Sequence, residues 1–88
     1  MIVGYKIRLD TIEKVKEFIK IVDKYENDID IISGRYLVNA KSIMALFSLE
    51  LTKPLNLIIH DASLSDVSRL EKDVEEFRVD EIWEYKSI

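Results

Sequence analysis

Ser42 is the residue of this 88-residue chain whose type and position best fit a regulatory role. It follows an extended run, residues 36–40, and precedes the apolar run 43–49. Serine is a favoured helix N-cap, because its hydroxyl accepts a hydrogen bond from a free amide of the first turn. A kinase can also phosphorylate the hydroxyl, and a phosphate there would meet the positive end of the helix dipole. The position therefore predicts a cap and, as a second role, a phosphorylation site.

Few other residues offer chemistry. His60 is the only histidine and cysteine is absent, which excludes disulfides, thiolate metal sites and cysteine nucleophiles. Since no second nitrogen or sulfur ligand exists beside His60, we expect no metal and no cofactor. The acidic runs 28–30 and 71–76 are typical of solvated faces, and nothing in the sequence arranges them in a cleft with a partner. No catalytic residue is predicted, and we expect the chain not to be an enzyme.

Hydrophobic periodicity predicts the elements that position Ser42. Alternating apolar residues over 5–9 predict a strand, and helical spacing from Ile12 predicts a helix over 12–25. Asp10 and Glu13 have the spacing of a capping box at its start. The same patterns predict the remaining elements: strands over 29–31, 36–40 and 55–60, a helix over 42–49, and a helix begun by Ser63 and Asp66 that buries Leu64, Val67, Leu70, Val74 and Phe77. This order predicts a two-layer α+β sandwich, open on one face.

The last ten residues, 79–88, have a distinct composition. Ile82, Trp83 and Tyr85 are β-branched or aromatic, and such residues are enriched in strands. We expect a further short strand here, or an extended segment packed on the core.

Residues 24–49 resemble the segment around the regulatory serine of the HPr family, the small phosphocarriers of the bacterial sugar phosphotransferase system. The specific matches are Lys24-Tyr25-Glu26-Asn27-Asp28-Ile29, which is similar to a Lys-Phe-x-x-Asp-Ile motif that opens the second strand, and Asn39-Ala40-Lys41-Ser42-Ile43-Met44. The resemblance extends from about Asp10 to Asp61, with a one-residue deletion after Leu49. It implies that residues 1–88 form a single HPr-like domain of order β-α-β-β-α-β-α in a bacterial protein.

The resemblance fails at the phosphorylated histidine of the family. In HPr this histidine is followed by Ala-Arg-Pro at the start of the first helix, whereas this chain has Thr11-Ile12-Glu13-Lys14. Thr11 has no nucleophilic nitrogen, and Glu13 would repel a phosphate. Phosphocarrier activity by the family mechanism is therefore not expected. The resemblance points instead to catabolite-repression HPr, which is phosphorylated only on its serine and acts through a transcriptional repressor, although that protein keeps Ala-Arg-Pro.

Three residues after Ser42 correspond to partner-docking positions in HPr-like proteins: Ile43, Met44 and Phe47. The short helix is too apolar to bury every side chain against one sheet, so we expect part of the set to be exposed. Alternatively, the aromatic segment 79–88 covers it within the chain.

Composition limits the classes of partner. The net charge is −4, which opposes direct binding of nucleic acid, because phosphate binding requires a cationic surface. No apolar run reaches the length of a membrane span, and the amino terminus lacks the pattern of a signal peptide. We therefore expect a cytoplasmic protein with no membrane partner.

These observations lead to one functional hypothesis and one alternative. The hypothesis is a non-catalytic HPr-like regulatory or adaptor protein that acts through protein–protein contacts around Ser42. Its sphere would be the phosphotransferase system or carbon regulation, and HPr serine kinase or a transcriptional regulator would be its partner. The alternative is a small-molecule-sensing α+β regulatory domain that shares no HPr partner.

Overall fold

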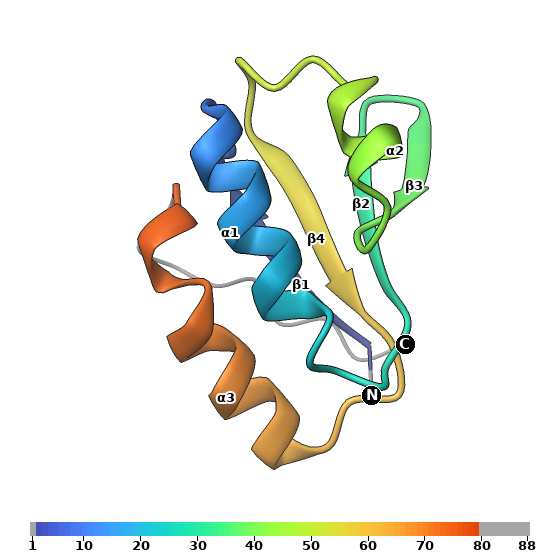
Figure 1. The fold of residues 1–88 in the computed structure, drawn as a ribbon. Helices are drawn as coiled ribbons and strands as arrows, with labels where there is room; N and C mark the ends of the chain where they lie inside the picture. The colour runs from blue at the N-terminus through green and yellow to red at the C-terminus, as the bar shows by residue number, and fades with distance from the viewer. Residues whose placement is uncertain (1, 80–88) are drawn as a thin grey trace.

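The computed structural model describes residues 2–79 of the chain, and Figure 1 shows the order of their strands and helices. The elements are β1 (Val3–Ile7), α1 (Ile12–Val22), β2 (Ile29–Ser33), β3 (Tyr36–Asn39), α2 (Ile43–Phe47), β4 (Leu55–Ile59), α3 (Leu64–Asp73) and the 3-10 turn η1 (Glu75–Phe77). The predicted order of strands and helices is confirmed. The predicted additional C-terminal strand lies outside the described residues.

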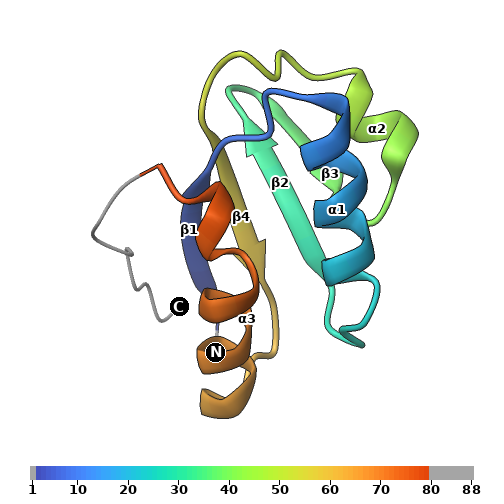
Figure 2. The ribbon, with the colours of Figure 1, turned by 60° about the vertical axis from the view of Figure 1, so that its left-hand side comes forward.

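The four strands form one antiparallel sheet in the order β1-β4-β2-β3. The three helices lie on the same side of this sheet in both views (Figures 1 and 2). The opposite face is covered by no element of residues 2–79, and we call it the open face. The predicted α+β open-faced sandwich is therefore confirmed.

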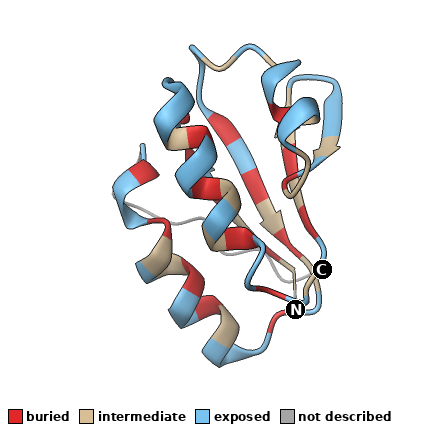
Figure 3. Cartoon of the chain, in the orientation of Figure 1, coloured by how far each residue is buried: buried red, intermediate tan, exposed pale blue. Residues whose placement is uncertain are grey.

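The hydrophobic core is formed by buried residues of both the sheet and the helices, which Figure 3 marks on strands and helices alike. Alternation places Val3, Tyr5 and Ile7 of β1 on the helix side, and Leu55, Leu57 and Ile59 of β4 repeat the pattern. Phe18 of α1 and Phe77 of η1 make an edge-to-face contact, with their ring centroids 6.0 Å apart. This contact packs η1 against α1.

The start of α1 differs from the sequence prediction. Thr11, not Asp10, is the N-cap, and its hydroxyl accepts a hydrogen bond of 3.1 Å from the amide of Lys14. The Asp10 carboxylate instead accepts a 2.9 Å bond from the Lys14 ammonium group, which lowers the pKa of Asp10. The predicted capping box of Asp10 and Glu13 is wrong, because the N-cap is one residue later than predicted, at Thr11.

Two residues on the predicted apolar faces of the helices are exposed. Ile12 and Leu64 are the first residues of their helices, and 58% and 70% of their surfaces are exposed. Helical spacing aligns them with buried residues, but both stand at the very start of a helix and are left largely exposed. The capping box of Ser63 and Asp66 is confirmed, and the amide of Ser63 bound to the carboxylate lowers the pKa of Asp66. That helix ends before Val74, although Val74 and Phe77 are still buried.

Candidate protein-contact surface

Helix α2 begins at the predicted cap. Ser42 has extended backbone angles, and its hydroxyl accepts a hydrogen bond of 3.3 Å from the amide of Ala45. At the other end, the hydroxyl of Ser48 donates a 2.6 Å bond to the carbonyl of Ala45. The helix ends at Phe47 and not near Leu49 as predicted. Because it is so short, the hydrogen bonds of Ser42 and Ser48 satisfy a large share of the backbone groups at its ends.

The segment before α2 is tied to two other elements. The side-chain carbonyl of Asn39 accepts a 2.8 Å bond from the amide of Lys41, and the amide of Ala40 donates to the carbonyl of Ile29 at 2.9 Å. The Lys41 ammonium group donates a 2.5 Å bond to the backbone carbonyl of Tyr25, beyond the end of α1. These contacts hold Ser42 and the start of α2 in place.

The helix presents an apolar surface to solvent. Leu46 is fully buried and packs α2 against the core. In contrast, 38%, 79% and 43% of the surfaces of Ile43, Met44 and Phe47 are exposed. We call these three residues the α2 surface. Ser42, half-buried, directly precedes it. The prediction that part of the apolar set remains exposed agrees with this arrangement, and no element within residues 2–79 covers it. The predicted cover by the aromatic tail lies outside the described residues.

Thr11, which the sequence resemblance aligns with the phosphorylated histidine of HPr, lies at the start of α1. Thr11 is exposed and its hydroxyl is occupied as the cap. Glu13 is exposed in the same turn, and the ammonium group of Lys14 is paired with Asp10. The turn therefore offers a hydroxyl and one paired cation, without an imidazole or guanidinium group.

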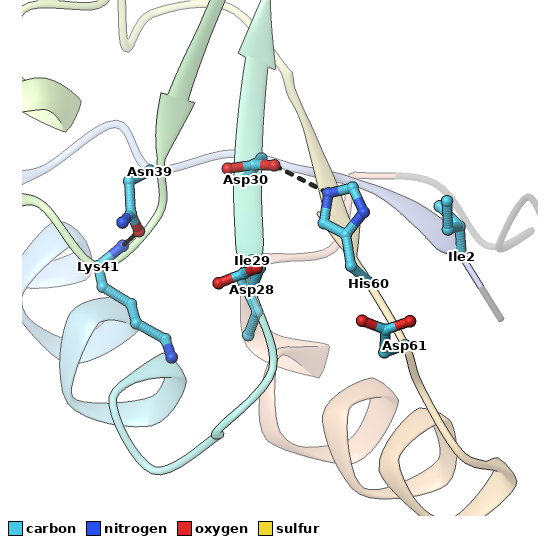
Figure 4. Close-up of a pocket in the computed structure, with 8 residues that line it drawn as sticks. All are labelled: Ile2, Asp28, Ile29, Asp30, Asn39, Lys41, His60 and Asp61. Carbon is cyan, nitrogen blue, oxygen red and sulfur yellow. Dashed lines mark hydrogen bonds and ion pairs between the residues drawn. The ribbon is translucent and has the colours of Figure 1, made fainter.

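His60 has a partner that the sequence did not suggest. Its Nε2 lies 2.8 Å from the carboxylate of Asp30, and Figure 4 shows the two side chains pointing toward one another on the open face. The backbone amide of His60 donates to the carbonyl of Asp28 at 2.9 Å. The expectation that the acidic run has no partner is therefore wrong for Asp30. Register explains the pairing, because His60 continues β4 beside β2.

The hollow around this pair is polar and mainly acidic. It is lined by Ile2, Asp28, Ile29, Asp30, Asn39, Lys41, His60 and Asp61 (Figure 4). Within residues 2–79 no cluster of histidine and carboxylate side chains is arranged to hold a metal ion. Nor does any helix in this part of the chain have the length and apolar character needed to cross a membrane.

The fold is similar to that of two solved HPr structures. The phosphocarrier protein HPr from Bacillus anthracis str. Ames matches with a TM-score of 0.67 and 18% identity, over 88% of this chain and 98% of that one. The structure described as HPr-C-His from Thermoanaerobacter tengcongensis matches with a TM-score of 0.65 and 22% identity, over 93% and 99% of the two chains. No protein-family model and no curated protein matches the sequence. At these identities the likeness establishes the architecture, and the chain has an HPr-like fold.

Proposed function

We propose that this chain is a non-catalytic regulatory or adaptor protein that binds other proteins through the α2 surface. The observation on which the proposal rests is the exposure of Ile43, Met44 and Phe47 on a helix whose start is fixed by Ser42 and Lys41. Fully burying one such side chain contributes about 1.5–3 kcal/mol. Apolar anchors at the centre of a contact commonly dominate its energy.

The proposed sphere is the phosphotransferase system or carbon regulation of a bacterium, in the cytoplasm. Support comes from the HPr-like fold together with the match of residues 39–44 to the segment around the HPr regulatory serine. HPr serine kinase and a transcriptional regulator are the proposed partners. With a net charge of −4, direct contact with nucleic acid is not proposed.

Histidine phosphotransfer is not part of the proposed function. Thr11 supplies no imidazole, and the carboxylate of Glu13 disfavours a second negative group in the same turn. His60 lies at the far end of β4, beside Asp30 and close to Asp28 and Asp61. Those carboxylates would repel a phosphoryl group on the imidazole.

Ser42 is the proposed point of regulation. Its hydroxyl directly precedes the α2 surface, so a phosphate there would add negative charge to the edge of an apolar contact. The nearest cation along the chain, Lys41, is bonded to the carbonyl of Tyr25. A phosphate would therefore act mainly by changing partner preference, not by recruiting Lys41.

Binding of purified HPr serine kinase without nucleotide tests the docking role. In a titration of the isotopically labelled chain, we expect amide shifts to concentrate on residues 42–48. The double substitution Ile43→Ser with Phe47→Ser should abolish them. Leu64→Ser is the matched control, since Leu64 is 70% exposed on a different helix, and this variant should bind like the wild type. Equal loss in both variants, or shifts centred on the acidic hollow, would reject the proposal.

A further inference from the structure

The open face of the sheet carries apolar side chains at its centre, at positions that alternate with the buried residues of each strand. Ile58 of β4 and Ile32 of β2 are diagonal neighbours in the observed register, and Leu37 of β3 lies directly opposite Ile32. The two isoleucines are half-buried, and Leu37 is 62% exposed. The solvated face of an antiparallel sheet is commonly polar at such positions. We call these three residues, together with Gly4 opposite Ile58, the open-face patch.

Opposite charges flank the open-face patch. Lys6 of β1 is exposed on the same face of the sheet. Asp28 is exposed at the start of β2, where the hydrogen bond from the amide of His60 to its carbonyl continues the ladder between β2 and β4. Within residues 2–79 neither Lys6 nor Asp28 takes part in an ion pair, whereas the neighbouring Asp30 is bound to His60. Both charges can therefore pair with groups of another molecule.

Strand register places Ile58 midway between these two charges. β4 lies between β1 and β2 in the sheet. Ile58 is opposite Gly4, two residues before Lys6, and opposite Asp30, two residues after Asp28. The two charges therefore lie on either side of Ile58 and in opposite directions along the strands. A two-fold axis that runs parallel to the sheet and passes over Ile58 brings each charge onto the opposite charge of a second copy.

We propose that two copies of this chain associate through their open faces about this axis. Lys6 of each copy then pairs with Asp28 of the other, and the two open-face patches pack together at the centre of the contact. Because Gly4 has no side chain, it leaves room beside Ile58 for an apolar side chain of the second copy, as the interdigitation of packed sheets requires.

Charge complementarity selects a second copy as the occupant of the open face. A partner surface of one charge sign matches either Lys6 or Asp28 and repels the other, whereas a second copy matches both. The net charge of −4 makes two copies repel one another at long range, so their association depends on these local pairs. The apolar residues near the axis supply the centre that a symmetric contact needs.

The inference is independent of the proposed function, but it has one consequence for it. The helices lie on the side of the sheet opposite the open face (Figures 1 and 2). A dimer formed through the open faces therefore leaves the α2 surface of both copies accessible, and the pair can hold two partners at once.

Sedimentation velocity of the full-length chain tests the association. We expect the sedimenting mass to rise toward twice that of the chain as the concentration is raised to about 1 mM, which is the range of weak specific complexes. Lys6→Glu and Asp28→Lys should each stay monomeric, because both ion pairs become contacts between like charges. An equimolar mixture of the two variants should recover the dimer, since opposite charges then meet at both contacts. Lys16→Glu changes the net charge as Lys6→Glu does, but on exposed α1, and this control should dimerise like the wild type.

A second pair of variants locates the contact. Ile58→Ser should lose the dimer, whereas the double substitution Ile43→Ser with Phe47→Ser should keep it. A wild-type chain that stays monomeric would overturn the proposal and leave the open face to solvent, to another segment of the chain or to a different protein. Charge variants that still dimerise alone, a mixture that stays monomeric, or a dimer lost only with the α2 surface would overturn it as well.

Discussion

The ammonium group of Lys41 and the backbone carbonyl of Tyr25 are joined by a hydrogen bond of 2.5 Å, which ties the residue before Ser42 to the segment that follows α1. The two residues are sixteen positions apart in the sequence, and the strands β2 and β3 lie between them. The bond is half-buried, so loss of the charged donor leaves the carbonyl with fewer partners.

We predict that Lys41→Met lowers the free energy of unfolding by about 1–2 kcal/mol, because a hydrogen bond from a charged donor is lost while the apolar stem is kept. Urea denaturation measures the change. Lys14→Met is the matched control: Lys14 also pairs through its ammonium group, but with the exposed Asp10. Solvent screening makes that pair weak, and the control should unfold close to the wild type. An equal change in both variants would argue against a stabilising role for the hydrogen bond from Lys41 to Tyr25.

Tyr25 gives a prediction for alkaline pH. Burial, together with the hydrogen bond of 2.8 Å that its hydroxyl donates to Asp73, raises the pKa of Tyr25 to about 12. Because the folded chain then holds this proton more tightly than the unfolded chain, the stability it contributes is present below pH 10 and is lost as pH rises toward 12. Urea titrations across this window should show a steeper decline for the wild type than for Tyr25→Phe. Parallel curves would contradict the assignment.

Incubation with phosphoenolpyruvate and the first enzyme of the phosphotransferase system should leave this chain without acid-labile phosphate. Thr11 lacks a nucleophilic nitrogen, and the acidic surroundings of His60 disfavour a phosphoryl group. Mass spectrometry under neutral conditions is the measurement, with an HPr that keeps its histidine as the positive control. Stoichiometric label on His60 would overturn the proposal of a non-catalytic role.

Much of the fold could be predicted because local patterns determine it. Alternation found β4 and β1, although β1 covers Val3–Ile7 and not residues 5–9, and Ser42 and Ser63 marked the starts of α2 and α3. Ile12 and Leu64 are exposed although they lie on the apolar faces, because periodicity gives the face of a helix but not which of its turns is covered.

The site was predictable to a lesser extent. The exposure of the α2 surface followed from the count of apolar residues on a short helix. In contrast, the pairing of His60 with Asp30 and the bond from Lys41 to Tyr25 depend on how distant segments come together. Strand register sets the first contact, and no local pattern encodes it. In the structure, the pairing of Ile29 with Ile59 sets the β2–β4 register and so brings His60 near Asp30.

Phosphorylation by HPr serine kinase is the most direct measurement of the central claim that Ser42 regulates a contact through the α2 surface. With kinase and ATP, we predict one phosphate per chain, mapped to Ser42 and absent in Ser42→Ala. The rate should fall sharply in the Ile43→Ser, Phe47→Ser variant and stay at the wild-type level in Leu64→Ser. A chain that the kinase leaves unmodified, or modifies at another hydroxyl, would contradict the claim and leave Ser42 as a helix cap.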